Sequence, residues 1–218
     1  MAKAKRSGAF IAIEGLDGAG KSSNLRNLEN WLSHTDTKHF VADEYKDLVF
    51  SNTLRTMLNE QNPRVDPVTE TFMFYSARIE HTQRILAPYL DSGYHVLTDR
   101  YSDSTRAYQS VKLGLERVEA IHAQAAHSLR EPDLVLFYDI PVEVYKQRVI
   151  LRGKGLDAIE SRGIEFFTQV RANYLQLAES NPRFVVIDAS QPLDAVLAES
   201  LRQVDSFLGK FNENHVQP

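Results

Sequence analysis

The hydrophobic positions of this chain follow two periodicities that alternate along its length. Five short apolar runs are typical of buried strands, and they occupy residues 10–13, 40–42, 94–98, 134–138 and 184–187. Between them, apolar positions recur at helical spacing over residues 23–32, 52–59, 67–92, 104–113, 115–128, 141–151, 163–180 and 193–208. This alternation predicts an α/β fold in which right-handed crossovers build a parallel sheet with helices on both faces. The stretch at 67–92 is long, and we expect it to bend.

Nothing in the sequence divides the 218 residues into parts. It contains no internal repeat, low-complexity tract or Gly/Ser linker, so we predict a single domain over residues 1–218.

The composition excludes several kinds of site and binding partner for this protein. The absence of cysteine excludes disulfides and thiolate metal sites and fits a reducing compartment. A net charge of −4 argues against broad nucleic-acid binding. No apolar segment approaches the ~18 residues of a membrane span, and the basic start of the chain lacks a cleavage site of small residues. We therefore expect a cytoplasmic protein without a nucleic-acid or membrane partner.

Residues 15–22 satisfy the phosphate-binding pattern G-x-x-x-x-G-K-S/T, and they lie where a predicted strand turns into a predicted helix. In that context the backbone N–H groups of residues 18–23 would converge on a polyphosphate at the positive end of a helix dipole. Lys21 would reach the outer phosphates, and the Ser22 hydroxyl would ligate Mg²⁺. The expected nucleotide-binding residues are Gly15, Asp17, Gly18, Ala19, Gly20, Lys21, Ser22 and Ser23.

Acidic residues follow several predicted strands, where ligands of open parallel sheets bind. These residues are Glu14, Asp43, Asp99 and Asp139. Asp99 is followed by Arg100, so we expect Asp99 to hold Mg²⁺ through water and Arg100 to clamp a phosphate. The alternative is an Asp–Arg pair that only closes the end of a strand.

Phe74 and Arg78 are four residues apart on a predicted helix and therefore share a face. The ring could stack on a nucleobase while the guanidinium binds one of its carbonyl oxygens. An aromatic stripe that belongs to the core is the alternative.

Arg148 and Arg152 share a helical face just before Gly153 and Gly155. Cations next to a glycine-hinged loop are typical of a lid that closes over phosphates, and we place such a lid at about residues 152–163. A solvated helix end with basic residues is the plainer interpretation.

Together these elements resemble the bacterial thymidylate kinases, which have the P-loop NTPase fold. The resemblance covers about residues 10–208 and rests on residues 13–23 and 99–109, with support from residues 73–78, 132–133, 166–167, 174–175 and 187–193. It implies transfer of the γ-phosphoryl group of ATP to dTMP with Mg²⁺. It also implies a five-stranded parallel sheet in the order 2-3-1-4-5 and a homodimer.

The resemblance assigns roles on the acceptor side. It places Asp17 near the acceptor phosphate and magnesium, and Arg100 on the phosphate of dTMP. Phe74 would stack on thymine, and Arg78 would donate to a thymine carbonyl oxygen. Thr105 and Tyr108 match positions that line the base and sugar pocket.

On the donor side, Arg148 matches a position where the family stacks a guanidinium on adenine. Asp157 begins the lid motif, which reads Asp-Ala-Ile-Glu here and usually Asp-Arg-Ile-Glu. The lid arginine must then come from Arg152, Lys154 or Arg162, and Arg152 is our choice. The expected catalytic set is Lys21, Asp17, Arg100 and Arg152.

A second departure concerns residues 43–48. Bacterial members usually read Arg-Glu-Pro-Gly-Gly-Thr after the second strand, whereas this chain reads Asp-Glu-Tyr-Lys-Asp-Leu. Lys46 is the candidate for the missing cation. This change leaves open a kinase of the same fold that acts on dUMP, a modified pyrimidine deoxynucleotide or another monophosphate. A regulatory NTPase that shares only the phosphate loop is the more distant alternative.

Overall fold

The computed structural model describes residues 8–60, 65–151 and 163–215. Its five strands are β1 (Phe10–Gly15), β2 (His39–Ala42), β3 (His95–Asp99), β4 (Leu134–Asp139) and β5 (Phe184–Asp188). They form one parallel sheet in the order β2-β3-β1-β4-β5. Each predicted strand is present with ends that differ by no more than two residues, and the expected strand order is confirmed.

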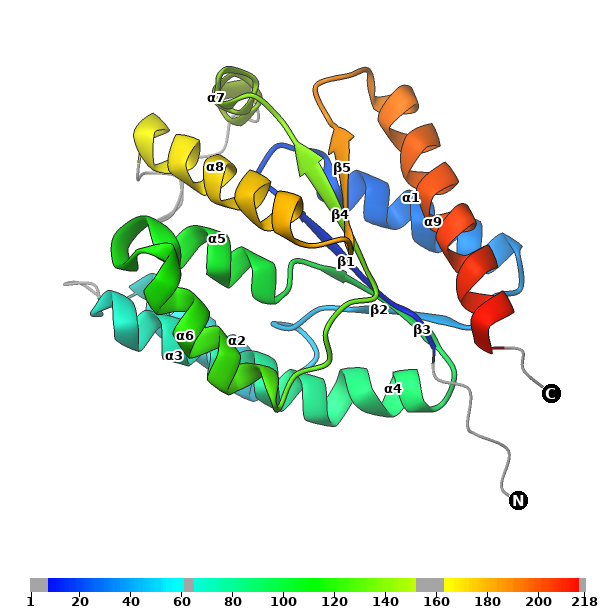
Figure 1. Ribbon diagram of the computed structural model, residues 1–218, viewed down its shortest axis with the longest axis horizontal. Coiled ribbons are helices and arrows are strands. Elements are labelled where there is room, and N and C mark those ends of the chain that lie inside the picture. Colours follow the sequence, from blue (N-terminus) through cyan, green and yellow to red (C-terminus); the bar gives the residue numbers. More distant parts are fainter. Residues whose placement is uncertain (1–7, 61–64, 152–162, 216–218) are drawn as a thin grey trace.

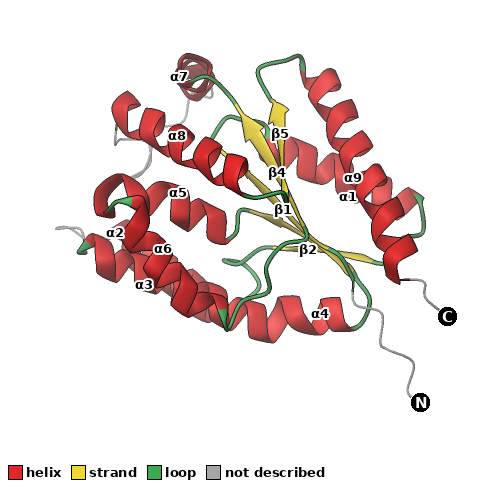
Figure 2. Cartoon of the chain, in the orientation of Figure 1, coloured by secondary structure: helices red, strands yellow, loops and turns green. Residues whose placement is uncertain are grey.

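Helices connect the strands and cover both faces of the sheet (Figures 1 and 2). They are α1 (Lys21–His34), α2 (Val49–Glu60), α3 (Pro67–His81), η1 (Thr82–Leu86), α4 (Ala87–Asp91), α5 (Ser102–Leu113), α6 (Leu115–Ala126), α7 (Val142–Leu151), α8 (Ile164–Ser180) and α9 (Leu193–His215). Helices α1 and α9 pack on one face, and α4, α5 and α8 pack on the other. Among the residues described, no helix combines the length and the apolar character needed to cross a membrane.

The long stretch at 67–92 is interrupted where Pro88 enters the helix. Pro88 has no N–H to donate to the carbonyl of residue 84, and its ring would clash with that carbonyl in a regular α-helix. The preceding turn widens into the π-helical segment η1, which separates α3 from α4.

Helix α9 continues to His215, seven residues past the predicted end at residue 208. The apolar face of the helix continues past residue 208, because Phe211, one turn after Phe207, also packs against the main core. The ring of Phe211 also meets the ring of His95 at a centroid distance of 6.1 Å.

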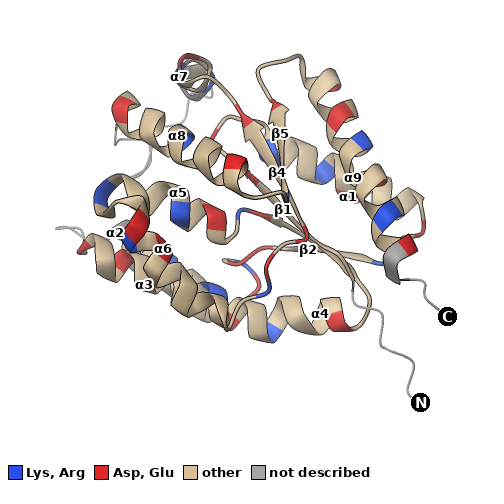
Figure 3. Cartoon of the chain, in the orientation of Figure 1, with Lys and Arg blue, Asp and Glu red and all other residues tan. Residues whose placement is uncertain are grey.

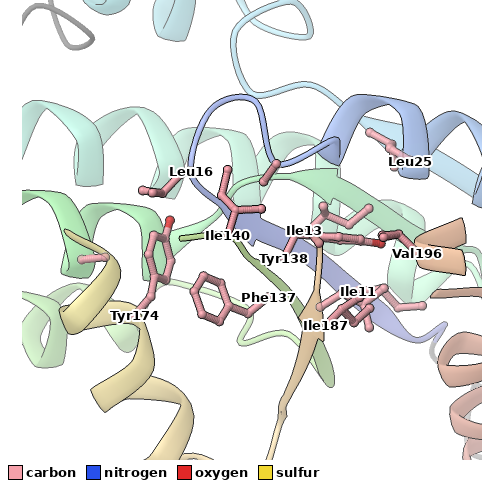
Figure 4. Packing of buried hydrophobic residues seen from close by; sticks show 14 of the residues in the cluster. Ile11, Ile13, Leu16, Leu25, Phe137, Tyr138, Ile140, Tyr174, Ile187 and Val196 are labelled. Atoms are coloured by element: carbon pink, nitrogen blue, oxygen red, sulfur yellow. The ribbon is translucent and has the colours of Figure 1, made fainter. Parts of the chain in front are cut away.

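The main core lies between the central strands and the helices on either side of them. All six residues of β1 are buried, which explains why this strand shows an unbroken apolar run instead of alternation. Figure 4 shows Ile11 and Ile13 of β1 close to Tyr138 of β4 and Ile187 of β5. The strand register pairs Ile13 with Asp99 and Gly15 with Tyr138, so the carboxyl ends of β1, β3 and β4 meet at one edge of the sheet.

Candidate active site

The phosphate loop, residues 15–22, joins β1 to α1 at that edge. Gly15 has a φ of 142°, and a Cβ atom there would lie 2.5 Å from the carbonyl oxygen of Tyr138. The loop therefore needs glycine at this position because the neighbouring strand approaches too closely for any side chain. The N–H groups of the first turn of α1 point out of the helix end, which is the arrangement that binds phosphates.

The side chain of Lys21 is buried and contacts the phosphate loop itself. Its Nζ donates to the carbonyl oxygen of Leu16 at 3.0 Å and lies 3.5 Å from Asp17 Oδ1. Burial, and after it the positive charge of Arg100, lowers the pKa of Lys21, whereas Asp17 raises it. The ammonium is thus held at the loop by a carbonyl and a carboxylate.

Ser22 and Asp99 meet at the outer side of the loop. Ser22 Oγ donates to Asp99 Oδ2 at 3.1 Å, while Asp99 Oδ1 is buried without a hydrogen-bond partner. Hydroxyl and carboxylate oxygens are the ligands that Mg²⁺ prefers. In the described part of the chain no group of three or more His, Cys, Asp or Glu side chains could hold a metal. A Mg²⁺ ion at Ser22 and Asp99 would therefore depend on phosphate and water oxygens for its remaining ligands, and the residues present fit that arrangement.

Arg100 directly follows β3 and lies next to Asp17 of the phosphate loop. Its Nη2 donates to Asp17 Oδ1 at 2.7 Å, and its guanidinium lies 5.2 Å from the centre of the Tyr108 ring. Although burial alone would raise it, Arg100 and Lys21 hold the pKa of Asp17 well below its usual range. One carboxylate therefore connects the cation of the phosphate loop with the cation that follows β3.

A third cation, Arg78, belongs to α3 and contacts α5. Its Nη1 donates to Thr105 Oγ1 of α5 at 2.7 Å, and its Nε lies 3.1 Å from Glu44 Oε2. The side chain is only 4% exposed. Phe74 lies one helical turn before Arg78 and is half-buried, so ring and guanidinium are brought to one face as expected. Arg78 and Thr105 thus lie where α3 meets α5, whereas the ring of Tyr108 packs against Phe166 and Tyr174 of α8.

Two predicted residues lie at the periphery of this group. Arg148 Nη1 donates to the carbonyl oxygen of Gly18 at 3.1 Å, which places Arg148 against the outside of the phosphate loop. Lys46 pairs with Asp43 Oδ2 at 2.7 Å, and its side chain is 84% exposed. The structure therefore does not hold Lys46 with Asp17 and Arg100. The lid residues Arg152, Lys154, Asp157 and Arg162 lie outside the described residues.

The sequence assigned no role to three residues that lie near these cations. Glu14 is fully buried, Glu44 forms an ion pair with Arg78, and the centre of the Tyr45 ring lies 4.5 Å from the guanidinium of Arg55. Burial, followed by the charge of Glu44, raises the pKa of Tyr45 to about 12, which keeps its phenol protonated. The available signal for Glu14 was an acidic residue directly after the apolar run 10–13 of a buried strand, because a buried carboxylate needs hydrogen-bond donors around it.

Comparison with known proteins agrees with this geometry. The sequence profile of the thymidylate kinase family matches residues 13–199. A thymidylate kinase from Caulobacter vibrioides is 41% identical over 88% of this chain and 93% of its own length. Those from Dinoroseobacter shibae and Thermosipho melanesiensis are 38% and 35% identical, over 88% and 91% of this chain and 94% and 98% of theirs. The chain belongs to the thymidylate kinase family.

Membership of the thymidylate kinase family confirms the expected enzyme class, a kinase that phosphorylates dTMP with ATP. It favours that activity over the regulatory NTPase, and the five-stranded sheet order agrees with it. The match extends across the departing segment at 43–48 and the lid. These differences are therefore variations within the family.

Proposed function

We propose that this chain transfers the γ-phosphoryl group of ATP to dTMP between the phosphate loop and Arg100. The observation that carries this proposal is the shared carboxylate of Asp17, which lies 2.7 Å from Arg100 and 3.5 Å from Lys21. Lys21 and Arg100 both lie beside the carboxylate of Asp17, and such an arrangement suits two phosphates that must come together there.

The phosphate-loop side of the site is assigned to ATP. The backbone of the phosphate loop and Ser23 would bind its phosphates, with Lys21 on the outer ones. Arg148 would stack on adenine from its position against Gly18. Ser22 and Asp99 would hold Mg²⁺, which when bound neutralises phosphate charge. Arg152 of the lid remains the proposed additional cation.

The acceptor side is assigned to dTMP. Arg100 would bind its phosphate, Phe74 would stack on thymine, and Arg78 would donate to a carbonyl oxygen of the base. Thr105 and Tyr108 would line the base and sugar. Lys46 and Asp157, the other acceptor residues expected from the sequence, remain predictions, and so does a cytoplasmic location.

The transfer itself needs alignment and charge neutralisation more than acid–base chemistry. An anionic oxygen of the dTMP phosphate forms a bond to the γ-phosphorus as the bond from that phosphorus to the β–γ bridging oxygen breaks. ADP leaves, and dTDP forms. Because the attacking oxygen carries no proton, no general base is required, and Lys21 and Arg100 stabilise the charge on the transferring group.

The second candidate acceptor is dUMP. Arg78 and Thr105 would meet the carbonyl and N3 edge of the base, which thymine and uracil share, and the unusual segment 43–48 contributes Glu44, which pairs with Arg78. The deciding experiment measures ADP release with ATP and Mg²⁺ against dTMP, dUMP, dCMP, dGMP and UMP in parallel. We expect dTMP to give the highest kcat/KM, whereas equal responses to all five would contradict the proposal.

We also propose that two copies pair through α2 and α3. Four of the eight large hydrophobic side chains that are exposed among the described residues lie on these two packed helices, and they are Val49, Phe50, Met57 and Phe72. An apolar face of this kind is typical of a protein interface. Light scattering should give a dimer mass that Phe50→Lys reduces, whereas Leu193→Lys, at an exposed position on α9, should leave it unchanged. A monomer mass for the unmodified chain would contradict this.

A further inference from the structure

Glu14 is a fully buried carboxylate at the end of β1, directly before the phosphate loop. It accepts four hydrogen bonds. Oε1 accepts from the backbone N–H groups of Tyr101 and Ser104, at 2.7 and 3.2 Å. Oε2 accepts from the hydroxyls of Ser104 and Tyr174, at 2.6 and 2.8 Å. All four partners supply a hydrogen, and two of them, as amides, can only donate.

The two backbone contacts fix the start of α5. Arg100 has a φ of 72°, a left-handed conformation that is costly for an arginine, and α5 begins two residues later. Tyr101, which precedes the helix, makes no capping hydrogen bond with its own side chain. Glu14 caps α5 from a different strand instead, and its charge lies at the positive end of the helix dipole. The carboxylate therefore stabilises the turn that carries Arg100.

The two hydroxyl contacts reach the guanidinium itself. Arg100 Nη1 donates to Ser104 Oγ at 3.1 Å and contacts the Tyr174 hydroxyl at 3.4 Å. The two hydroxyl oxygens lie 2.8 Å apart, and the ring of Tyr174 is stacked on Phe137 (Figure 4). Because both hydroxyl hydrogens point toward Glu14, the oxygen lone pairs are left for Arg100. The carboxylate, which accepts from both hydroxyls, thus sets the direction of two acceptors that hold the arginine.

We infer that Glu14 is a positioning residue, which aligns Arg100 for the phosphate of the acceptor nucleotide through Ser104 and Tyr174. This inference rests on the proposed function, because it requires that Arg100 binds the acceptor. It adds a residue that touches neither nucleotide and yet determines how well one of them binds.

Glu14→Gln tests the inference with little change in shape. The amide oxygen can still accept from the N–H groups of Tyr101 and Ser104. The new NH₂ group, however, donates to the two hydroxyls, so their hydrogens turn toward Arg100. The guanidinium and the hydroxyls then face each other as donors, which is unfavourable. We expect the KM for dTMP to rise on the order of tenfold, while kcat and the KM for ATP change by less than about threefold. A defect confined to folding would not separate the two substrates in this way.

Two further variants keep the test decisive. Tyr174→Phe preserves the ring on Phe137 and removes one hydroxyl, so it should raise the KM for dTMP in the same direction even if Glu14→Gln folds poorly. Asp139→Asn is the matched control. Asp139 is also an acidic residue at a strand end, but its partner is Arg171 of α8, at 2.6 Å. It should leave the KM for dTMP unchanged.

Arg100→Ala, assayed in parallel, separates the possible failures. An unchanged KM for dTMP in that variant would overturn both the proposed function of Arg100 and the role of Glu14. A raised KM in Arg100→Ala together with unchanged KM values in Glu14→Gln and Tyr174→Phe would overturn only the role of Glu14.

Discussion

Ser22 donates its hydroxyl hydrogen to Asp99 Oδ2 across 3.1 Å, and the other carboxylate oxygen of Asp99 is buried without a partner. This pair joins the first turn of α1 to the end of β3. A buried carboxylate oxygen without a hydrogen-bond partner, such as Asp99 Oδ1, is tolerated where a bound cation supplies the missing interaction.

Asp99→Asn is expected to raise the Mg²⁺ concentration needed for half-maximal rate about tenfold or more, because an amide oxygen binds a hard cation more weakly than a carboxylate does. Titration of the initial rate with Mg²⁺ at saturating nucleotides measures this. Asp91→Asn, in which the altered carboxyl is exposed and pairs with Arg130, serves as the control. An identical Mg²⁺ dependence in Asp99→Asn and the unmodified enzyme would remove Asp99 from the metal site.

Lys21→Ala should lower kcat by ~10²-fold or more, by analogy with the loss of one preorganised electrostatic contact. The substitution also leaves Asp17 with Arg100 as its remaining cation. Steady-state kinetics at saturating ATP and dTMP provides the value. Lys38→Ala, at an exposed position before β2, should retain normal turnover. Near-normal kcat in Lys21→Ala would refute the role of this residue.

Arg78→Ala should reduce the preference for dTMP over dCMP, since the proposed contact of the guanidinium is to a carbonyl oxygen of the base where cytosine presents an amino group. We expect the ratio of the two kcat/KM values to fall about tenfold, as for one charged hydrogen bond. Arg84→Ala, on the exposed side of η1, where Arg84 pairs with Glu80, is the control. A ratio that does not move would show that Arg78 does not contact the base.

Stability should decline as the pH falls below about 6.5, through His95. Burial, and after it the neighbouring His39, lowers the pKa of His95 below its usual value, and its Nδ1 accepts the N–H of Ala9 at 2.9 Å. The unfolded chain then binds a proton at a higher pH than the folded chain does, so the contribution is complete above the unfolded pKa and is lost as pH falls through the folded one.

Urea unfolding at pH 8 and at pH 5.5 measures this loss. His95→Asn places an oxygen acceptor where Nδ1 lies and removes the titration, so it should reduce the difference between the two pH values. His122, whose pKa is also lowered, chiefly by burial, should retain its part of the difference. An equal pH dependence in both proteins would contradict the assignment to His95.

Two glycine substitutions should have opposite signs. Gly15→Ala places a Cβ atom 2.5 Å from the Tyr138 carbonyl oxygen at a φ of 142°, and we expect a loss of about 1–3 kcal/mol in the free energy of unfolding. Gly209→Ala lies in α9 with no atom within 4 Å of the added Cβ. It should gain about 0.5–1 kcal/mol. Chemical denaturation of both variants against the unmodified chain is the measurement.

Local signals were sufficient for most of the fold and for locating the phosphate loop at the turn between β1 and α1. The phosphate loop was identified because glycines, Lys21 and Ser22 are adjacent in sequence and lie between a strand and a helix, so their geometry follows from the chain itself. Asp99 and Arg100 were identified because acidic and basic residues at a strand end reach the ligand edge of any parallel sheet.

Contacts between distant residues were not predictable in the same way. Nothing local relates Glu14 to Tyr174, or Glu44 to Arg78, because each pair meets only after helices have packed. The charge pattern illustrates this difficulty. Figure 3 shows an acidic and a basic band side by side on α5, where Asp103 pairs with Arg106, yet Arg106 also binds Glu119 of the next helix. The domain prediction, the lid and the pairing of two copies remain predictions.

The carboxylate of Asp17 pairs with both Lys21 and Arg100, so the strength of one ion pair depends on the other. When the acceptor phosphate binds Arg100, Asp17 keeps only its ion pair with Lys21. When a donor phosphate binds Lys21, Asp17 keeps only its ion pair with Arg100. The affinities of the two substrates are then thermodynamically coupled, each depending on whether the other is present, although no part of the backbone has to move.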